Sequence, residues 1–106
     1  MQREINIGEK SVTLLANAAT PYYYTRTFNE EFFDVISSDP SDGKATVVFQ
    51  RLAYIMACQA EGTVKAASVD GFIEWLEGFS TSGMTDATGD IADAYYGNAV
   101  SKSIPK

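Results

Sequence analysis

The chain has 106 residues, of which 45% are hydrophobic, and a formal net charge of -6. A chain of this length forms one domain and buries about 65% of the surface that its unfolded state exposes. Its eight basic residues are scattered, so no stripe of Lys and Arg exists that would neutralise phosphates. We therefore expect no binding to nucleic acid or to anionic membranes.

The N-terminal residues carry no sign of a targeting segment. They lead into an alternating pattern without the apolar core of a signal peptide, and no later segment approaches the roughly 20 apolar residues of a spanning helix. Cys58 is the only cysteine, which excludes an internal disulfide, and we expect it to pack as a small hydrophobe. The expected location is the cytoplasm of the cell that makes the protein.

Apolar and polar residues alternate near the start of the chain. Ile5 and Ile7 precede a turn that contains Gly8, and Val12 and Leu14 follow it, which predicts a β-hairpin over residues 4–15. Its apolar face has to be covered by helices or by strands of another copy, because an isolated hairpin is marginally stable in water. We regard the four apolar side chains as candidates for self-association.

A first helix is predicted from residue 21 to about residue 36. Thr20 supplies an N-cap hydroxyl, and Pro21 suits the first helical position. The apolar residues of this segment recur at helical spacing and form one stripe: Tyr24, Phe28, Phe32 and Val35, widened by Phe33 and Ile36. The turn-forming residues 37–44 then predict a surface loop.

Three further helices are predicted, over residues 45–60, 68–79 and 86–100. The first precedes the terminator Gly62 and is expected to be the central core helix, with Val48, Leu52, Ile55, Met56 and Gln59 at helical spacing. Ser68 can cap the second, whose apolar residues are Val69, Phe72, Ile73, Leu76 and Phe79.

The last helix is weaker because of Gly89 and Gly97, and it follows turn-rich residues 80–85. Residues 101–106 are expected to form a disordered tail. These elements together predict a mainly α fold with a small N-terminal β-hairpin, a compact bundle of three to four helices in a single domain over residues 4–100.

Residues suited to catalysis are scarce. Histidine is absent, which excludes the usual Ser–His and Cys–His pairs and every metal site that contains histidine. Asp86, Asp90 and Asp93 have a spacing that would suit a hard cation, but carboxylates near a helix start also favour the helix dipole and solvent. Solvent-facing charge likewise explains the pairs Glu30 with Glu31 and Glu74 with Glu77. We expect no enzyme activity, no cofactor and no metal.

Three aromatic residues are candidates for binding another protein. The run from Tyr22 to Tyr24 points around more than half a helical turn, so one core face cannot hold all three rings. Tyrosine is enriched at interfaces, and Trp75 lies near the edge of the apolar stripe of its helix. Tyr22, Tyr23 and Trp75 are therefore the candidate protein-binding residues.

Several short motifs arrive in a recognisable order over about residues 5–79. The hairpin has the form Ile-x-Ile-x-x-Lys-x-Val-x-Leu, and Ala18-Ala19-Thr20-Pro21 and Tyr24-x-x-x-Phe28 follow it. Residues 52–60 read Leu-Ala-Tyr-Ile-Met-Ala-x-Gln-Ala, and residues 72–79 read Phe-Ile-Glu-Trp-Leu-Glu-x-Phe. This order resembles the tail assembly chaperones of siphophages and prophages of Gram-positive hosts.

The resemblance implies a protein that is absent from the finished virion. Its copies would coat the tape measure protein in the host cytoplasm and keep it soluble while the major tail protein polymerises around it. The implied partners are thus the tape measure protein, the major tail protein and further copies of the chain. The alternative is another small phage or bacterial adaptor, such as a head-tail connector component. An enzyme that works with carboxylates alone is a second alternative, which the missing histidine disfavours.

Overall fold

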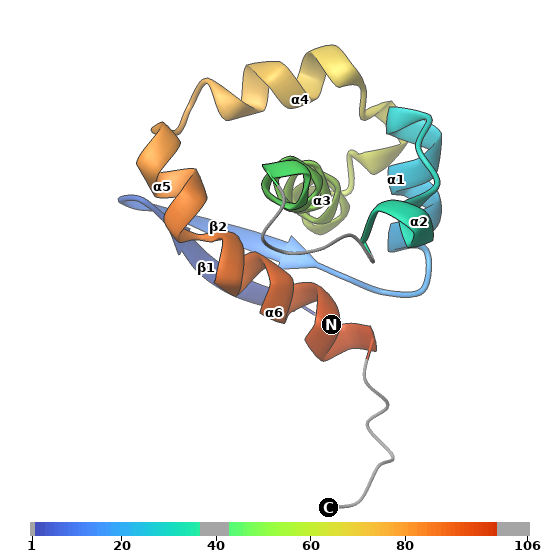
Figure 1. The fold of residues 1–106 in the computed structure, drawn as a ribbon, viewed down its shortest axis with the longest axis horizontal. Helices are drawn as coiled ribbons and strands as arrows, with labels where there is room; N and C mark the ends of the chain where they lie inside the picture. The colour runs from blue at the N-terminus through green and yellow to red at the C-terminus, as the bar shows by residue number, and fades with distance from the viewer. Residues whose placement is uncertain (1, 37–42, 100–106) are drawn as a thin grey trace, which may run out of the picture.

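Helix α3, Gly43–Glu61, is the axis of the molecule, and the other elements surround it (Figure 1). The computed structural model describes residues 2–36 and 43–99. All residues from 52 to 59 are buried, so this part of α3 contacts neighbours on every side, as predicted for a central core helix. The expected loop residues 37–42 and the expected tail over residues 101–106 lie outside the described residues.

The described residues are mainly helical and begin with a two-stranded antiparallel hairpin, which confirms the predicted fold class. They contain six α-helices and one 3-10 turn, η1 (Val64–Ala66). This number exceeds the three to four helices expected. One predicted helix is divided in two, and one predicted turn region is itself helical.

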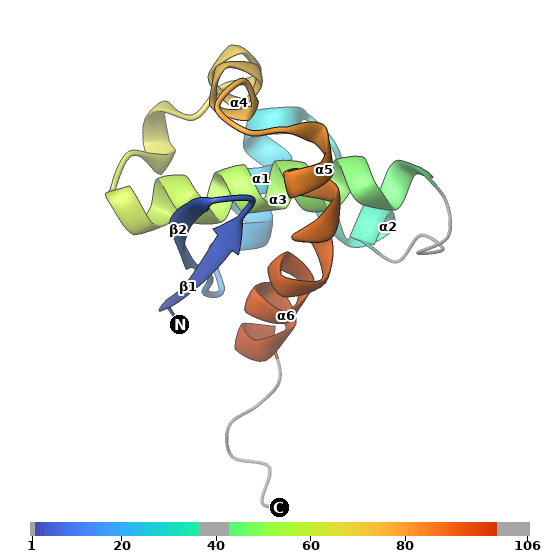
Figure 2. The same cartoon turned by 90° about the vertical axis from the view of Figure 1, so that its left-hand side faces the viewer.

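Strands β1 (Gln2–Ile7) and β2 (Lys10–Leu15) form the predicted hairpin. Gly8 has a φ of 64°, the positive value that the first central residue of a type II′ turn requires. The predicted apolar face is real, since three of its residues are buried and Val12 is half-buried. It packs inside the same chain: α3 lies against β2, and α6 (Thr88–Ala99) lies against β1 (Figure 2).

The single helix predicted over residues 21–36 is wrong, because the chain breaks between α1 (Thr20–Phe28) and α2 (Phe32–Ile36). Asn29 ends α1 in the left-handed conformation, with a φ of 54°. Asn tolerates this conformation better than most residues. The change of direction brings the rings of Tyr24 and Phe32 to 5.2 Å in an edge-on contact inside the core.

Thr20 does not cap α1 as predicted. It is the first residue of the helix, and Ala19 takes the N-cap position without a side-chain hydrogen bond. The Thr20 hydroxyl instead accepts a hydrogen bond from the backbone N–H of Asn17 at 2.9 Å and donates one to Gln59 at 2.7 Å. The start of α1 is thereby attached to the last turns of α3.

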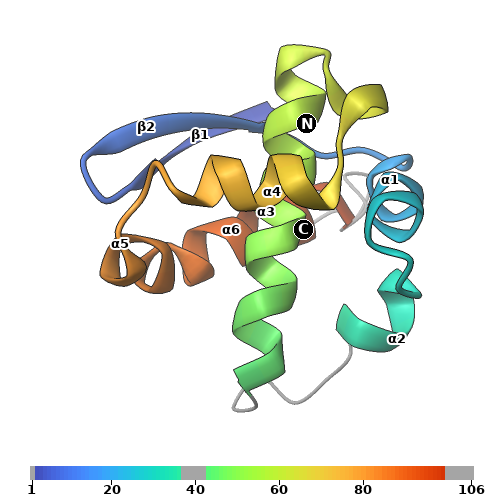
Figure 3. The same cartoon turned by 90° about the horizontal axis from the view of Figure 1, so that it is seen from above.

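Helix α4 (Val69–Leu76) crosses above α3 and ends earlier than predicted (Figure 3). Its N-cap is the predicted one, because the Ser68 hydroxyl accepts a hydrogen bond from the N–H of Gly71 at 2.9 Å. The prediction that Ile73 belongs to the core stripe is wrong, since its side chain is 50% exposed. A helix that touches the core along one side buries Phe72 there, and Ile73 lies about 100° further around the helix.

The residues predicted as a turn before the last helix form α5 (Thr81–Asp86). Ser80 caps it by accepting a hydrogen bond from the N–H of Gly83 at 3.0 Å. A Cβ atom added to Gly83 would lie 3.2 Å from the backbone of Gly8, so α5 packs closely against the hairpin turn. In α6 the predicted periodic residues Ile91, Ala94 and Tyr95 are buried.

Candidate protein-binding site

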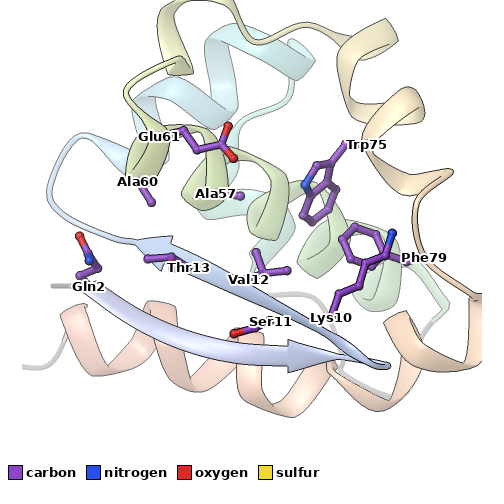
Figure 4. A pocket seen from close by; sticks show the side chains of 10 residues that line it. All are labelled: Gln2, Lys10, Ser11, Val12, Thr13, Ala57, Ala60, Glu61, Trp75 and Phe79. Carbon is purple, nitrogen blue, oxygen red and sulfur yellow. The ribbon is translucent and has the colours of Figure 1, made fainter.

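A groove runs between β2 and α4, and we call it the β2–α4 groove (Figure 4). Its volume is about 550 Å³. Residues of β2, with Gln2 of β1 at one end, form one wall, Trp75 and Phe79 form the other, and α3 supplies the floor. The lining residues are Gln2, Lys10, Ser11, Val12, Thr13, Ala57, Ala60, Glu61, Trp75 and Phe79.

The β2 wall presents backbone as well as side chains. Ile7 pairs with Lys10 across the two-residue turn, and the next pairs are Asn6 with Ser11 and Ile5 with Val12. A turn of this kind closes with a hydrogen bond between its flanking residues, and bonded and non-bonded pairs then alternate along an antiparallel ladder. The amide of Val12 is therefore used inside the hairpin. Those of Ser11 and Thr13 point outward, away from β1.

Ring contacts hold the residues of the aromatic wall together. The ring centroids of Trp75 and Phe79 are 4.9 Å apart, and Trp75 also contacts Tyr54 of α3 at 5.8 Å. At this end of the groove the Lys10 ammonium lies 5.3 Å from the centre of the Phe79 ring and donates a hydrogen bond to the Gly78 carbonyl at 2.5 Å. Lys10 thereby ties the hairpin to the residues after α4.

Opposite charges mark the two ends of the groove. Figure 4 shows Lys10 beside Phe79 at one end and Glu61 beside Ala60 at the other. Between them the groove is lined by the apolar side chains of Val12, Ala57 and Ala60. An apolar ligand group fits the middle of this groove, and a polar or charged group fits each end.

A second accessible surface lies on α1 and α2, and we call it the Tyr22–Phe33 surface. Tyr22 is 71% exposed and Phe33 is 58% exposed. The two rings border a hollow of about 390 Å³ whose other lining residues are Pro21, Thr25, Arg26 and Glu31. This hollow offers two aromatic rings beside one cation and one anion.

A polar network attaches α1 to α3. The Tyr24 hydroxyl donates a hydrogen bond to the Glu30 carboxylate at 2.7 Å, and Arg51 pairs with the same carboxylate at 2.8 Å. Burial, together with the adjacent carboxylate, raises the pKa of Tyr24 well above its ordinary value. Burial opposes ionisation of Glu30, but the bonds from Tyr24 and Arg51 outweigh it and lower its pKa. A carboxyl with a lowered pKa is a poor general acid, and the network serves to hold the fold.

The three predicted protein-binding residues do not form one site. Tyr22 lies on the Tyr22–Phe33 surface, and Trp75 lines the β2–α4 groove. Tyr23 is half-buried, with the Arg26 guanidinium 5.0 Å from the centre of its ring. The sequence pattern placed Phe33 in the apolar core stripe, and this is wrong, because its side chain is 58% exposed. Phe33 follows Phe32 directly, and that adjacency was the available signal, because neighbours on a helix point about 100° apart.

The hairpin residues predicted for self-association are mostly enclosed. Ile5, Ile7 and Leu14 are at most 5% exposed, and Val12 is half-buried beside the β2–α4 groove. Their side chains are therefore occupied by contacts with α3 and α6. Any pairing of hairpins between copies has to use the strand backbones.

The carboxylates considered above as catalytic or metal-binding candidates do not converge in the described part of the chain. Asp86, Asp90, Asp93, Glu74 and Glu77 are all exposed, and no group of metal-ligating side chains occurs within residues 2–36 and 43–99. Cys58 is buried as expected, and burial raises the pKa of its thiol. No helix in those ranges has the length and apolar character needed to cross a membrane.

The chain was compared with family models, with curated proteins and with solved structures, and none of them matches it.

Proposed function

We propose that this chain is a non-catalytic tail assembly chaperone of a siphophage or prophage. In this proposal it acts in the host cytoplasm, where it binds the tape measure protein and keeps it soluble while the major tail protein assembles. It is then absent from the mature virion. The family resemblance of residues 5–79 suggests this role.

One observation carries the proposal furthest: the domain has accessible aromatic surface that its own core does not need. The core is closed by residues such as Leu52, Ile55 and Ile91, each fully buried, while Tyr22 and Phe33 remain mostly exposed. Exposed aromatic side chains on a small domain indicate a surface for a partner. The β2–α4 groove adds a second place, on other elements, where one copy can hold a partner chain.

The partner's chemistry suits these surfaces. A long helical protein with exposed apolar stretches aggregates unless they are covered. Aromatic surfaces cover such stretches, and a net charge of -6 on each bound copy makes the coated chain repel other coated chains. Shielding of this kind needs no covalent chemistry.

Association between copies remains part of the proposal, because a long tape measure protein offers room for many. Because Ile5, Ile7 and Leu14 are buried, we expect two copies to contact each other through the backbone groups of the strands and not through these side chains. Light scattering on the purified protein, alone and with its partner, measures the number of copies.

Co-expression with the cognate tape measure protein tests the proposed function. The chaperone role requires that the tape measure protein be soluble with this chain and insoluble without it. Ring-shaped oligomers that show no affinity for the tape measure protein would instead favour a head-tail connector component.

A further inference from the structure

We infer that the β2–α4 groove binds an extended segment of a partner polypeptide, which adds a third strand at the outer edge of β2. The inference rests on the proposed function only in requiring that the chain bind another polypeptide. It specifies the conformation of the bound segment, the edge that it pairs with and the side chains that it carries.

The backbone of β2 supplies the first reason. Four consecutive residues of β2, Lys10 to Thr13, line the groove, although their side chains alternate between the two faces of the hairpin. A groove on one face of the hairpin would be lined by every second residue, whereas a groove along the strand edge is lined by consecutive residues. The register directs the amides of Ser11 and Thr13 toward that edge, so an incoming strand finds the donors and acceptors that strand addition requires.

The other walls supply the second reason. On an added strand, alternate side chains point to opposite faces. One set would face Trp75, Phe79 and the alanine floor, and the other set would face solvent. The facing positions therefore take apolar side chains, a larger one against the two rings and a smaller one above Ala57 and Ala60.

The charges at the two ends of the groove indicate which charged residues the bound segment carries. Lys10 lies at the aromatic end and Glu61 at the alanine end (Figure 4). A segment with an acidic residue near Lys10 and a basic residue near Glu61 is complementary to both. The occupant is thus an alternating polar and apolar strand with opposite charges at its ends.

A single extended chain fits this place better than a second folded copy. The outer edge of β2 faces a groove whose far wall is α4 with the residue Phe79 that follows it. A second copy that offered its own β2 would bring its own α4 into the same space.

Trp75 provides a direct readout, because it is the only tryptophan of the chain and lines the groove. The probe is a displayed library of random peptides of about ten residues, the upper end of ordinary strand lengths. Selected peptides are synthesised, and their binding is measured by the change in Trp75 fluorescence. We expect the enriched sequences to alternate polar and apolar residues and to shift the emission of Trp75.

Main-chain methylation of a selected peptide tests strand addition itself. We expect N-methylation of the alternate amides that face β2 to weaken binding about tenfold or more, because each lost backbone hydrogen bond and the added methyl group both oppose pairing. Methylation of the intervening amides, which face away, is expected to change binding less than about threefold. A purely hydrophobic pocket shows no such alternation.

Substitutions in β2 test the same backbone pairing from the side of the protein. Thr13→Pro removes an outward amide, which an edge strand tolerates, and is expected to weaken peptide binding about tenfold with little change in melting temperature. Thr13→Ala keeps the amide and is expected to bind as the unaltered protein does. Val12→Pro removes an amide used inside the hairpin and is expected to lower the melting temperature. If Thr13→Pro fails to fold, the methylated peptides still decide the question.

Four results would overturn the inference. They are the absence of any selected peptide that changes Trp75 fluorescence, selected sequences with apolar residues at helical spacing, binding that is indifferent to the position of the methyl group, and a dimer of the chain that Thr13→Pro dissociates. Because the library contains random peptides, any of them can occur while the chain still solubilises the tape measure protein. Failure of this inference is therefore distinct from failure of the proposed function.

Discussion

The hydroxyl of Thr20 donates a 2.7 Å hydrogen bond to the side-chain carbonyl of Gln59, and both residues are buried. Asn17 completes the network: its side-chain oxygen accepts hydrogen bonds from the Gln59 amide at 3.1 Å and from the backbone N–H of Ala19 at 2.9 Å. The connection between β2 and α1 is thereby fixed to the end of α3. This junction orients the hairpin and α1 around the same helix.

Replacing either partner of this bond is expected to destabilise the fold. Thr20→Val and Gln59→Leu each leave a buried polar group unsatisfied, which costs about 1 to 3 kcal/mol. Urea unfolding measures the change, and Thr85→Val, the same replacement at an exposed site, is the control with an expected change of about 0.5 kcal/mol or less. The double variant should lose less than the sum of the two singles. Additive losses would mean that the two side chains do not interact.

The Glu30 network makes stability depend on pH. The pKa of Glu30 is lowered in the fold, so its contribution is complete above the unfolded value of about 4.3 and is lost as the pH falls through the folded value. We expect the melting temperature to fall as the pH drops below about 5. Glu30→Gln should be less stable than the unaltered protein at neutral pH, with the difference shrinking as the pH falls. A difference that stays constant with pH would contradict the role of this carboxylate.

Two glycines on different helices provide a matched pair with opposite expected signs. A methyl group at Gly71 would collide with the Tyr54 hydroxyl, which accepts a hydrogen bond from the N–H of Ser68 at 3.3 Å. Gly71→Ala is expected to destabilise by about 1 to 3 kcal/mol. Gly89 has open space around the same position, so Gly89→Ala should stabilise α6 by about 0.5 to 1 kcal/mol. Thermal unfolding of both variants distinguishes this account from one in which both changes have the same sign.

The sequence pattern correctly predicted the elements in which regularly spaced apolar residues lie on a buried face. The hairpin was recognisable because Ile5, Ile7 and Leu14 alternate around a glycine turn, and α3 because its apolar residues recur at helical spacing. The break at Asn29 was not recognisable from the sequence, because the apolar spacing of Tyr24, Phe28 and Phe32 continues across it. At this break Glu30 pairs with Arg51 of α3, a tertiary contact that the local spacing does not reveal.

The candidate binding site was predictable only in part, for a geometric reason. Trp75 was identifiable from its place at the edge of a helical stripe, and Tyr22 from its place in a run of three tyrosines. The β2–α4 groove also contains Phe79 and Ala57, which come from segments that only the tertiary fold brings together. A one-dimensional pattern does not specify which helix passes beside which strand edge.

The aromatic candidates should separate into binding and packing roles. Tyr22→Ala and Phe33→Ala remove rings that are mostly exposed, so we expect weaker binding of the tape measure protein with an unfolding free energy within about 0.5 kcal/mol of the unaltered protein. Trp75→Ala also removes ring contacts with Tyr54 and Phe79, and should lower stability by about 1 kcal/mol or more. Pull-down and urea unfolding of the same variants measure the two effects. Equal loss of stability in all three would assign Tyr22 and Phe33 to the core.

The solubility of the cognate tape measure protein tests the central claim most directly. The tape measure protein is expressed alone, with this chain, and with a Tyr22→Ala, Phe33→Ala double variant, and its soluble fraction is measured after centrifugation. The account predicts an insoluble protein when it is expressed alone, a soluble complex with the unaltered chain, and an intermediate or lost effect with the double variant. A tape measure protein that is equally soluble in all three cases would contradict the chaperone function.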